Sequence, residues 1–218
     1  MSSASELRAI ALAEFATAGY LGTSLQRIAD LAGLAKSSVL YHYASKETLL
    51  EAAVSPAIES MEGILVSFAG GPLTPARRRA FIEEFVDFLL QYRLEVHLFI
   101  NQGLSIADVP VMGRANELVV RLAGFFSAAS SSVEDIMRFG VALGGAAYTL
   151  VTRESLGLDD EDEAQTRAAL IAIIAELLAP IEPRSAAGTD SAAGARLAAG
   201  RRSATNPRPT TDPCLASE

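Results

Sequence analysis

The fold is decided by residues 23–46, which read TSLQRIADLAGLAKSSVLYHYASK. Ile28 and Ala32 are spaced to give a short first helix an apolar face. Gly33 follows directly, where a helix end favours a residue that tolerates a positive φ angle. Val39 supplies an apolar contact through which a second helix packs across the first. The stretch therefore predicts two short helices folded about a tight turn.

The second of these helices carries polar side chains at its exposed positions, which are Lys36, Ser37, Ser38, Tyr41 and His42. All of them can bond to phosphates or to the edges of bases. Short polar side chains at a helix N-terminus fit the major groove of DNA, and Lys and Arg add charge and reach. The pattern therefore predicts a DNA-binding surface.

Helical patterns flank this stretch on both sides. Upstream, apolar residues recur at helical spacing from Leu7 to Phe15, and Gly19 ends the run. Thr23, with Gln26 three residues later, predicts a capping box for the first short helix. Downstream, Ser45 is a candidate N-cap for a fourth helix.

Residues 5–52 resemble the tetracycline-repressor (TetR) family of bacterial transcription regulators. The matching residues, in order and without gaps, are Phe15, Gly19-Tyr20, Thr23-Ser24, Ile28-Ala29, Ala32-Gly33, Lys36, Leu40-Tyr41-His42-Tyr43, Ser45-Lys46-Glu47 and Leu49-Leu50. The resemblance implies phosphate contacts by Thr23, Ser24, Tyr41, His42 and Lys46. It also implies that the residues closest to base edges are Gln26, Arg27, Lys36, Ser37 and Ser38. Two positions depart from the family pattern: Ala35 stands where a Ser or Thr cap is usual, and Leu40 where a phosphate-binding tyrosine is most frequent.

Charge is unevenly distributed along the chain, whose net charge is −8. Residues 51–180 hold nine basic and eighteen acidic residues, whereas residues 1–50 hold four of each. An acidic body repels DNA except through the neutral N-terminal end, which would help to orient docking. Affinity would then depend on several phosphate contacts per subunit and on two subunits.

The composition argues against several other classes of protein. Cys214 is the only cysteine, which excludes an internal disulfide and fits a reducing cytoplasm. No run of about 18 apolar residues is present to span a membrane. The two histidines, His42 and His97, lie in different predicted domains, and there is no Gly-rich phosphate loop or nucleophile elbow. We therefore expect a soluble cytoplasmic protein with no catalytic residues, metal or cofactor, and we interpret the acidic run 159–163 as a helix start.

The rest of the chain shows helical patterns and no period-2 strand pattern, so the predicted class is all-α. We expect further helices over residues 45–68 (with a kink at Pro56), 75–92, 95–107, 110–126, 134–155 and 159–180. The predicted domains are a helix-turn-helix domain over residues 1–46 and a helical ligand-binding and dimerisation domain over residues 47–182. Residues 183–218 have few large apolar side chains and are expected to form a disordered tail.

Two further sites are expected in the helical domain. An apolar ligand cavity is predicted from aromatic, Met and polar residues; the alternative is that these side chains are plain core. The predicted residues are Met61, Phe85, Phe88, Tyr92, His97, Phe99, Asn101, Gln102, Met112, Phe125, Phe126, Phe139 and Tyr148. The resemblance implies a dimer interface on the last two helices, for which we expect Gly140, Gly144, Ala147, Leu170 and Ile174. Glycines inside a helix favour close approach of a second helix, either from the partner or from the same chain.

The resulting hypothesis is a dimeric repressor that binds a palindromic DNA operator and is released by a small lipophilic molecule. One alternative is a TetR-like activator or a regulator controlled by a protein partner. The other is a helical small-molecule carrier that has lost DNA binding.

Overall fold

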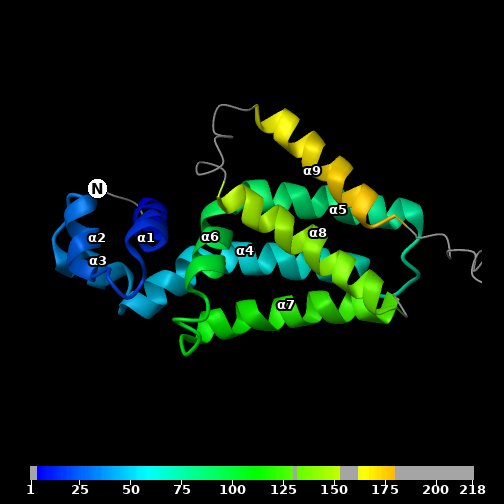
Figure 1. The fold of residues 1–218 in the computed structure, drawn as a ribbon. Coiled ribbons are helices and arrows are strands. Elements are labelled where there is room, and N and C mark those ends of the chain that lie inside the picture. Colours follow the sequence, from blue (N-terminus) through cyan, green and yellow to red (C-terminus); the bar gives the residue numbers. More distant parts are fainter. Residues whose placement is uncertain (1–3, 130–131, 153–161, 180–218) are drawn as a thin grey trace, which may run out of the picture. The chain divides into compact units, whose positions relative to one another are not determined.

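The structure is a computed structural model that describes residues 4–129, 132–152 and 162–179. Within these ranges all the regular structure is helical, which confirms the all-α class (Figure 1). The helices are α1 (Ala4–Ala18), α2 (Leu25–Leu31), α3 (Lys36–His42), α4 (Lys46–Phe68), α5 (Pro75–Gln91), α6 (Arg93–Gln102), α7 (Pro110–Ala129), α8 (Val133–Val151) and α9 (Glu163–Leu177).

The first three helices and the start of α4 share a small apolar core. Its fully buried members are Leu7, Ala11, Phe15, Ile28, Ala29, Val39, Leu49 and Leu50. These are the apolar positions of the helical periodicity, so the pattern of the sequence and the packing agree. Helices α1, α2 and α3 together form what we call the reading head.

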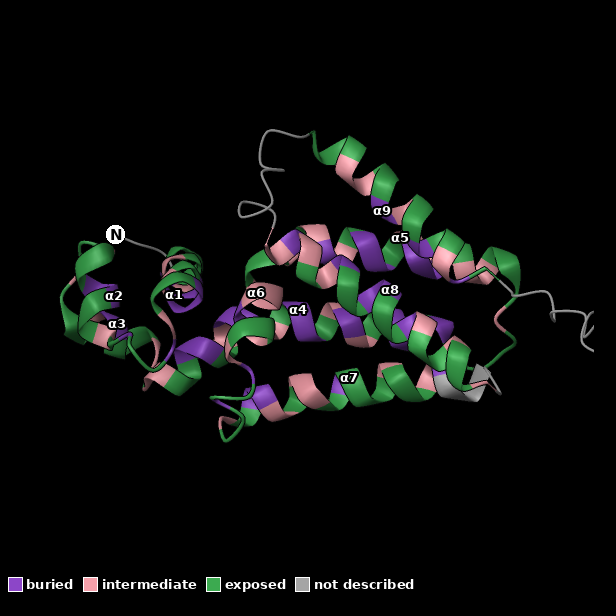
Figure 2. Cartoon of the chain, viewed as in Figure 1, coloured by how far each residue is buried: buried purple, intermediate pink, exposed green. Residues whose placement is uncertain are grey.

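Helix α4 connects the reading head to the rest of the chain. Ser45 caps it: its side chain accepts from the Thr48 backbone N–H, and the Thr48 hydroxyl accepts from the Ser45 backbone N–H. This confirms the predicted N-cap. The helix continues past Pro56, which lies on its exposed side, and contacts α1, α5 and α7. Buried residues recur along its whole length (Figure 2).

Helices α5 to α9 form the helical body. Thr74 caps α5 and Pro75 is its first residue, as predicted. In its core Phe126 packs edge-to-face against Phe81, with ring centroids 5.2 Å apart, and stacks on Phe139, with ring centroids 3.9 Å apart. Helix α9 packs on α5 and α8 but exposes most of its residues (Figure 2).

Helix α6 ends earlier than the sequence predicts. It stops at Gln102. The chain then forms a turn in which a hydrogen bond joins residues three apart, from the Ser105 backbone N–H to the Gln102 carbonyl. Ile106, only 3 % exposed, anchors this turn. Residues 95–107 are therefore a shorter helix followed by a packed turn.

Other predicted ends fall partly outside the described residues. Helix α8 ends at Val151, and α9 begins at Glu163 with Asp162 as its N-cap. The predicted extensions over residues 153–155 and 159–161 lie outside the described residues. The predicted tail, residues 183–218, lies outside them as well.

Candidate DNA interface and ligand cavity

The turn between α2 and α3 has the predicted geometry. Gly33 has a φ of +66°, which a residue with a side chain rarely adopts. The backbone N–H of Leu34 donates to the Ala29 carbonyl over 2.9 Å and closes the end of α2. Ala35 is the N-cap of α3 and makes no side-chain cap bond, as expected. The chain thus forms a helix-turn-helix in which the N-terminus of α3 is open to solvent.

Most of the predicted DNA-contact residues are exposed on this head. Those that are exposed are Ser24, Gln26, Arg27, Lys36, Ser37, Tyr41 and His42; Ser38 and Lys46 are partly buried. Tyr41 is 87 % exposed and Leu40 beside it 42 %. An aromatic side chain so free of the core can reach a phosphate, and its hydroxyl can donate to it.

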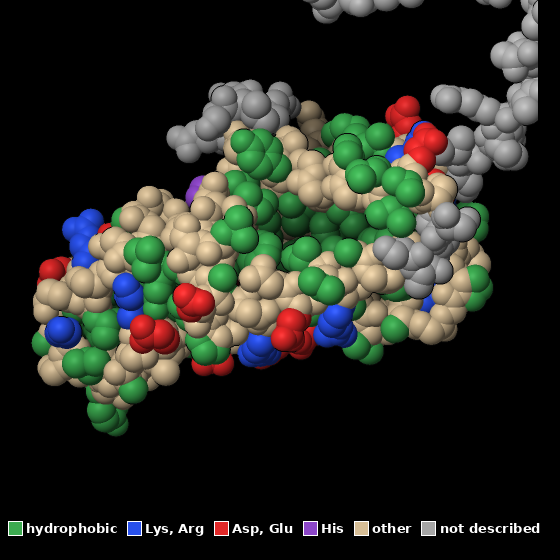
Figure 3. Space-filling view, turned by 60° about the horizontal axis from the view of Figure 1, so that its bottom comes forward, with side chains coloured by type: hydrophobic (Ala, Val, Ile, Leu, Met, Phe, Trp, Pro, Cys, Tyr) green, Lys and Arg blue, Asp and Glu red, His purple; other side chains and the backbone are tan. Residues whose placement is uncertain are grey.

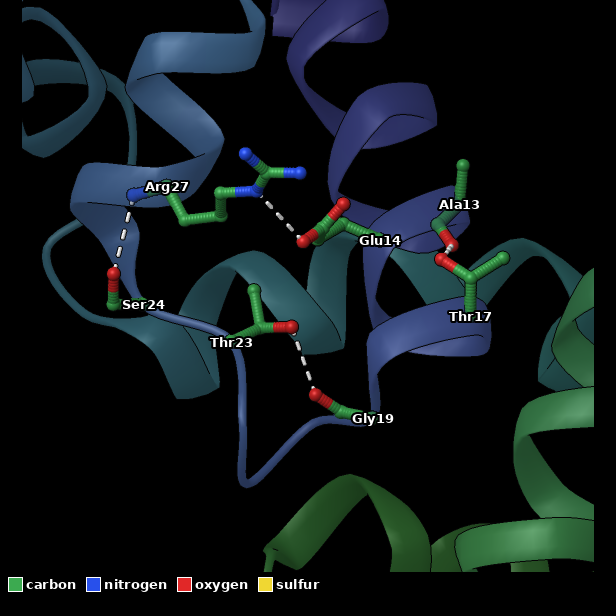
Figure 4. Close-up of polar contacts among 7 residues, drawn as sticks. All are labelled: Ala13, Glu14, Thr17, Gly19, Thr23, Ser24 and Arg27. Atoms are coloured by element: carbon green, nitrogen blue, oxygen red, sulfur yellow. Dashed lines mark hydrogen bonds and ion pairs between the residues drawn. The ribbon is translucent and has the colours of Figure 1, made fainter.

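The exposed polar residues of α2 are already paired within the head. The Arg27 Nε donates to the Glu14 carboxylate of α1 over 3.0 Å (Figure 4). The Gln26 amide donates to the Asp30 carboxylate over 2.8 Å. Gln26 therefore does not form the predicted capping box.

The cap of α2 is Ser24 rather than Thr23. The Ser24 side chain accepts from the Arg27 backbone N–H, while the Thr23 hydroxyl donates to the Gly19 carbonyl over 2.8 Å (Figure 4). Thr23 is only 3 % exposed. The predicted cap was wrong by one residue, because the Thr23 side chain is used to close the turn after α1. In this structure that side chain is not accessible to a phosphate, contrary to expectation.

Lys46 also has an internal role. Its ammonium donates to the carbonyls of Tyr20 and Thr23, both over 2.9 Å, and lies 4.3 Å from the centre of the Tyr20 ring. Burial raises the pKa of Tyr20 to about 12, and the charge of Glu47 acts in the same direction. Lys46 thus joins the start of α4 to the turn before α2, and its predicted phosphate contact stays a prediction.

The helical body contains an open cavity of about 800 Å³. Residues of α4, α5, α6, α7 and α8 line it, and nearly all of them are apolar. Figure 3 shows hydrophobic side chains lining a hollow in this part of the molecule. A space of this size accommodates a drug-sized ligand.

Eight of the predicted ligand residues lie on the cavity wall, namely Met61, Phe85, Phe88, Phe99, Met112, Phe126, Phe139 and Tyr148. The other five do not. Tyr92 packs on Phe88 and accepts from the Gln91 amide, and Phe125 packs on Phe81 and Phe126. Asn101 is exposed and donates to the His97 carbonyl within α6. His97 is partly buried away from the wall.

Gln102, the last of the five, is directed to the reading head. Its Nε2 donates to the Phe15 carbonyl over 2.8 Å, and its Oε1 accepts from the Tyr20 backbone N–H over 2.6 Å. The residues of α6 that line the cavity are Glu95, Val96, Leu98, Phe99 and Ile100. One short helix therefore touches both the cavity and α1. Glu95 was missed, because a Glu in the first turn of a helix is an ordinary helix-start signal.

The predicted dimer residues fall in two settings, and their role in dimerisation stays a prediction: Gly140 and Gly144 are exposed, whereas Leu170 and Ile174 are buried. Gly140, Gly144 and Ala147 are on the cavity wall. A Cβ built on Gly140 or Gly144 meets no atom within 4 Å, so neither glycine is required by close packing within the described chain. Leu170 and Ile174 are 8 % and 1 % exposed. These two side chains are buried within their own chain, so in this structure they are not exposed to a partner.

Comparisons with known proteins agree with this architecture. Residues 7–53 match the family described as bacterial regulatory proteins, tetR family. A TetR-family regulator from Streptomyces coelicolor A3, SCO3833, is 25 % identical, with a TM-score of 0.61 over 81 % of this chain and 91 % of that one. A putative fatty acid metabolism regulator of Clostridium perfringens is 17 % identical, with a TM-score of 0.61 over 81 % of this chain and 99 % of the other. A search of curated protein sequences gives no match.

The exposed helix-turn-helix defines a DNA-binding transcription regulator, with a helical C-terminal domain behind the reading head. Residues 7–53 therefore match the TetR family of bacterial regulators, and the fold over most of the chain is similar to that of a solved TetR-family regulator. None of its helices, as far as they are described, combines the length and apolar character needed to cross a membrane.

Proposed function

We propose that the protein is a cytoplasmic repressor that binds a palindromic operator as a dimer and leaves it when a small lipophilic molecule enters the cavity. The observation that carries this proposal is the position of α6. This helix lines the cavity, and its Gln102 side chain forms hydrogen bonds with the backbone at the end of α1. In this proposal residues 1–46 read DNA and residues 47–182 respond to the ligand and dimerise.

The DNA contacts follow from the exposed residues of the head. Lys36 and Ser37, at the start of α3, are the candidates for base edges, together with Arg27 of α2. Ser24, Tyr41 and His42 are the candidates for phosphates. A two-fold dimer would present two such heads to successive major grooves.

Release of DNA upon ligand binding requires a mechanical link between the cavity and the reading head. A molecule that pushes on Val96 or Phe99 moves α6, and the two bonds of Gln102 transmit the movement to the end of α1. A ligand shifts this equilibrium only by binding one arrangement more tightly than the other. Ligand binding thus changes the placement of the reading heads and leaves the helix-turn-helix itself folded.

Dimerisation is proposed on α9 and its neighbour α8. Ile173 of α9 is 54 % exposed, and Ala169 and Ala172 beside it are exposed too. Small side chains around one larger apolar residue allow a second helix to approach closely. In this proposal the exposed face of α9 takes the place of Leu170 and Ile174, which are buried.

The test is titration of labelled DNA from around the protein's own gene at two salt concentrations. The protein should bind one short palindrome tightly, and affinity should fall steeply with salt. Ser37→Glu should abolish this binding, because it puts a carboxylate on the exposed start of α3. Ser67→Glu is the matched control. It makes the same change at an exposed position near the far end of α4, about 30 Å along that helix from its first residue at 1.5 Å per residue.

If the wild-type protein bound none of this DNA above the non-specific level, the proposal that it represses its own gene would be refuted. That result would favour the carrier hypothesis if the cavity still bound an apolar probe.

A further inference from the structure

One charged side chain stands among the apolar residues of the cavity wall. Glu95, in the first turn of α6, is the only acidic or basic residue that lines the cavity in the described part of the chain. It is partly buried, and no described residue gives it an ion pair or a side-chain hydrogen bond. Burial raises the pKa of Glu95, with only its own backbone N–H acting against this shift.

An unpaired carboxylate in apolar surroundings favours a partner of opposite charge. Charges are kept out of such places unless they are paired, because the loss of water around them is unfavourable. Here the surrounding wall has no Lys or Arg to supply the pair. Because Glu95 lines the cavity, a ligand that lies in the cavity can supply the opposite charge.

The aromatic residues of the wall suit the same kind of ligand. Phe99 lies one helical turn from Glu95 on the same wall, and the other aromatic lining residues are Phe85, Phe88, Phe126, Phe139 and Tyr148. The faces of aromatic rings attract cations, most strongly where water is excluded. The carboxylate and the rings thus favour one charge sign, and both disfavour an anion.

We infer that the cavity selects a lipophilic molecule with a single protonated amine, whose ammonium group is bound by the Glu95 carboxylate while its apolar part fills the aromatic wall. This inference rests on the proposed ligand response and adds the chemical class of the ligand. Glu95 is then the residue that determines specificity, and molecules ending in a carboxylate are rejected by like-charge repulsion.

The experiment measures binding of three probes to the full chain by isothermal titration calorimetry at neutral pH. The probes are decylamine, decanol and decanoate, which share one apolar chain and carry a positive, a neutral and a negative end at this pH. The expected order of affinity is amine, then alcohol, then carboxylate, with about tenfold between the first two, equivalent to about 1.4 kcal/mol.

Glu95→Gln keeps the shape of the side chain and removes its charge. This variant should bind decylamine about tenfold more weakly and decanol within about twofold of the wild type, so that decanol reports an intact cavity. Glu117→Gln is the control, since Glu117 is exposed on α7 and does not line the cavity. The Glu117→Gln variant should retain the full preference for decylamine. This control separates the effect of the Glu95 charge in the cavity from a general attraction of the amine to an acidic protein.

Two results would overturn the inference, and they differ from each other. Equal binding of the three probes, or a preference for the amine that survives Glu95→Gln, would refute the role of Glu95 and leave the ligand cavity standing. Failure of all three probes to bind would overturn the inference together with the proposed ligand response.

Discussion

Gln102 and Phe15, 87 positions apart in the chain, are joined by a hydrogen bond from the side-chain amide to the backbone carbonyl over 2.8 Å. The other atom of the same amide accepts from the Tyr20 backbone N–H. A single side chain thus satisfies two backbone groups at the end of α1. Helix α6, which lines the cavity with other residues, contacts the reading head through Gln102.

Gln102→Ala should loosen this contact. The variant should lose about 1–2 kcal/mol of unfolding free energy, since two hydrogen bonds are removed and two backbone groups are left without partners. The Tyr20 amide should exchange its hydrogen faster. Asn101→Ala is the matched control, because Asn101 bonds only within its own helix, to the His97 carbonyl. Equal amide exchange at Tyr20 in both variants would show that Gln102 does not hold α1.

Lys46 and Lys36 should behave differently when each is replaced by Ala. Lys46→Ala should lower unfolding free energy by about 2 kcal/mol, because its ammonium donates two hydrogen bonds inside the protein. Lys36 is exposed and forms no ion pair with the described residues. Lys36→Ala should leave stability unchanged and reduce the slope of log affinity against log salt by about 1 per contact.

Thermal melts and DNA titrations over a salt series measure both effects. A reduced salt slope with unchanged stability in Lys46→Ala would instead support the phosphate contact expected from the sequence.

Gly144→Leu and Ile173→Glu separate the cavity from the dimer interface. Gly144→Leu adds a side chain on the cavity wall, where a Cβ has open space, so it should weaken decanol binding without changing the oligomeric state. Ile173→Glu should shift the protein to monomer in sedimentation velocity, because it puts a charge on the exposed apolar face of α9. Val66→Glu, at another exposed apolar residue, should remain a dimer. If the Gly144→Leu variant were monomeric, the dimer interface expected from the sequence would be supported instead.

The ion pair between Asp87 of α5 and Arg167 of α9 predicts a small dependence of stability on pH. The guanidinium donates to both carboxylate oxygens, one over 2.9 Å, and lowers the pKa of Asp87. A lowered pKa in the folded state adds stability above the ordinary carboxyl pKa, and this stability is lost as pH falls through the folded value. The effect is small because both side chains are exposed.

Asp87→Asn should therefore melt below the wild type at pH 7, and the difference should shrink as the pH falls through the lowered pKa of Asp87 and vanish below it. Asp108→Asn, at an exposed carboxyl in the turn after α6, is the control. A difference that persists unchanged at low pH would exclude the ion pair as its cause.

Local signals in the sequence predicted local structure well. Gly33 and Ser45 each specify a backbone geometry through their own chemistry, and both predictions were confirmed. Thr23 and Ser24 show the limit of such signals. Both carry a hydroxyl that can cap α2, and the choice depends on the contact of Thr23 with Gly19, which belongs to a different part of the fold.

Helical periodicity gave the apolar faces but not what each face contacts. Ile174 and Gly144 both fit an apolar stripe, yet one is buried in the chain and the other lines an open cavity. The same limit applies to Gln102, whose partners lie more than 80 positions away. Such outcomes depend on the packing of whole helices, which the spacing of residues within one helix does not specify.

The pairing of Arg27 with Glu14 has a consequence for the entropy of DNA binding. A free arginine side chain loses about 2 kcal/mol of rotamer freedom when it is fixed. In this head the Nε–H is already held by Glu14, while the terminal nitrogens are not bonded to it. A base contact by Arg27 would therefore use a side chain whose motion is restricted before the DNA arrives. If Arg27 contacts a base as proposed, the α1–α2 contact prepares the arginine for recognition, and Glu14 adds to affinity without touching DNA.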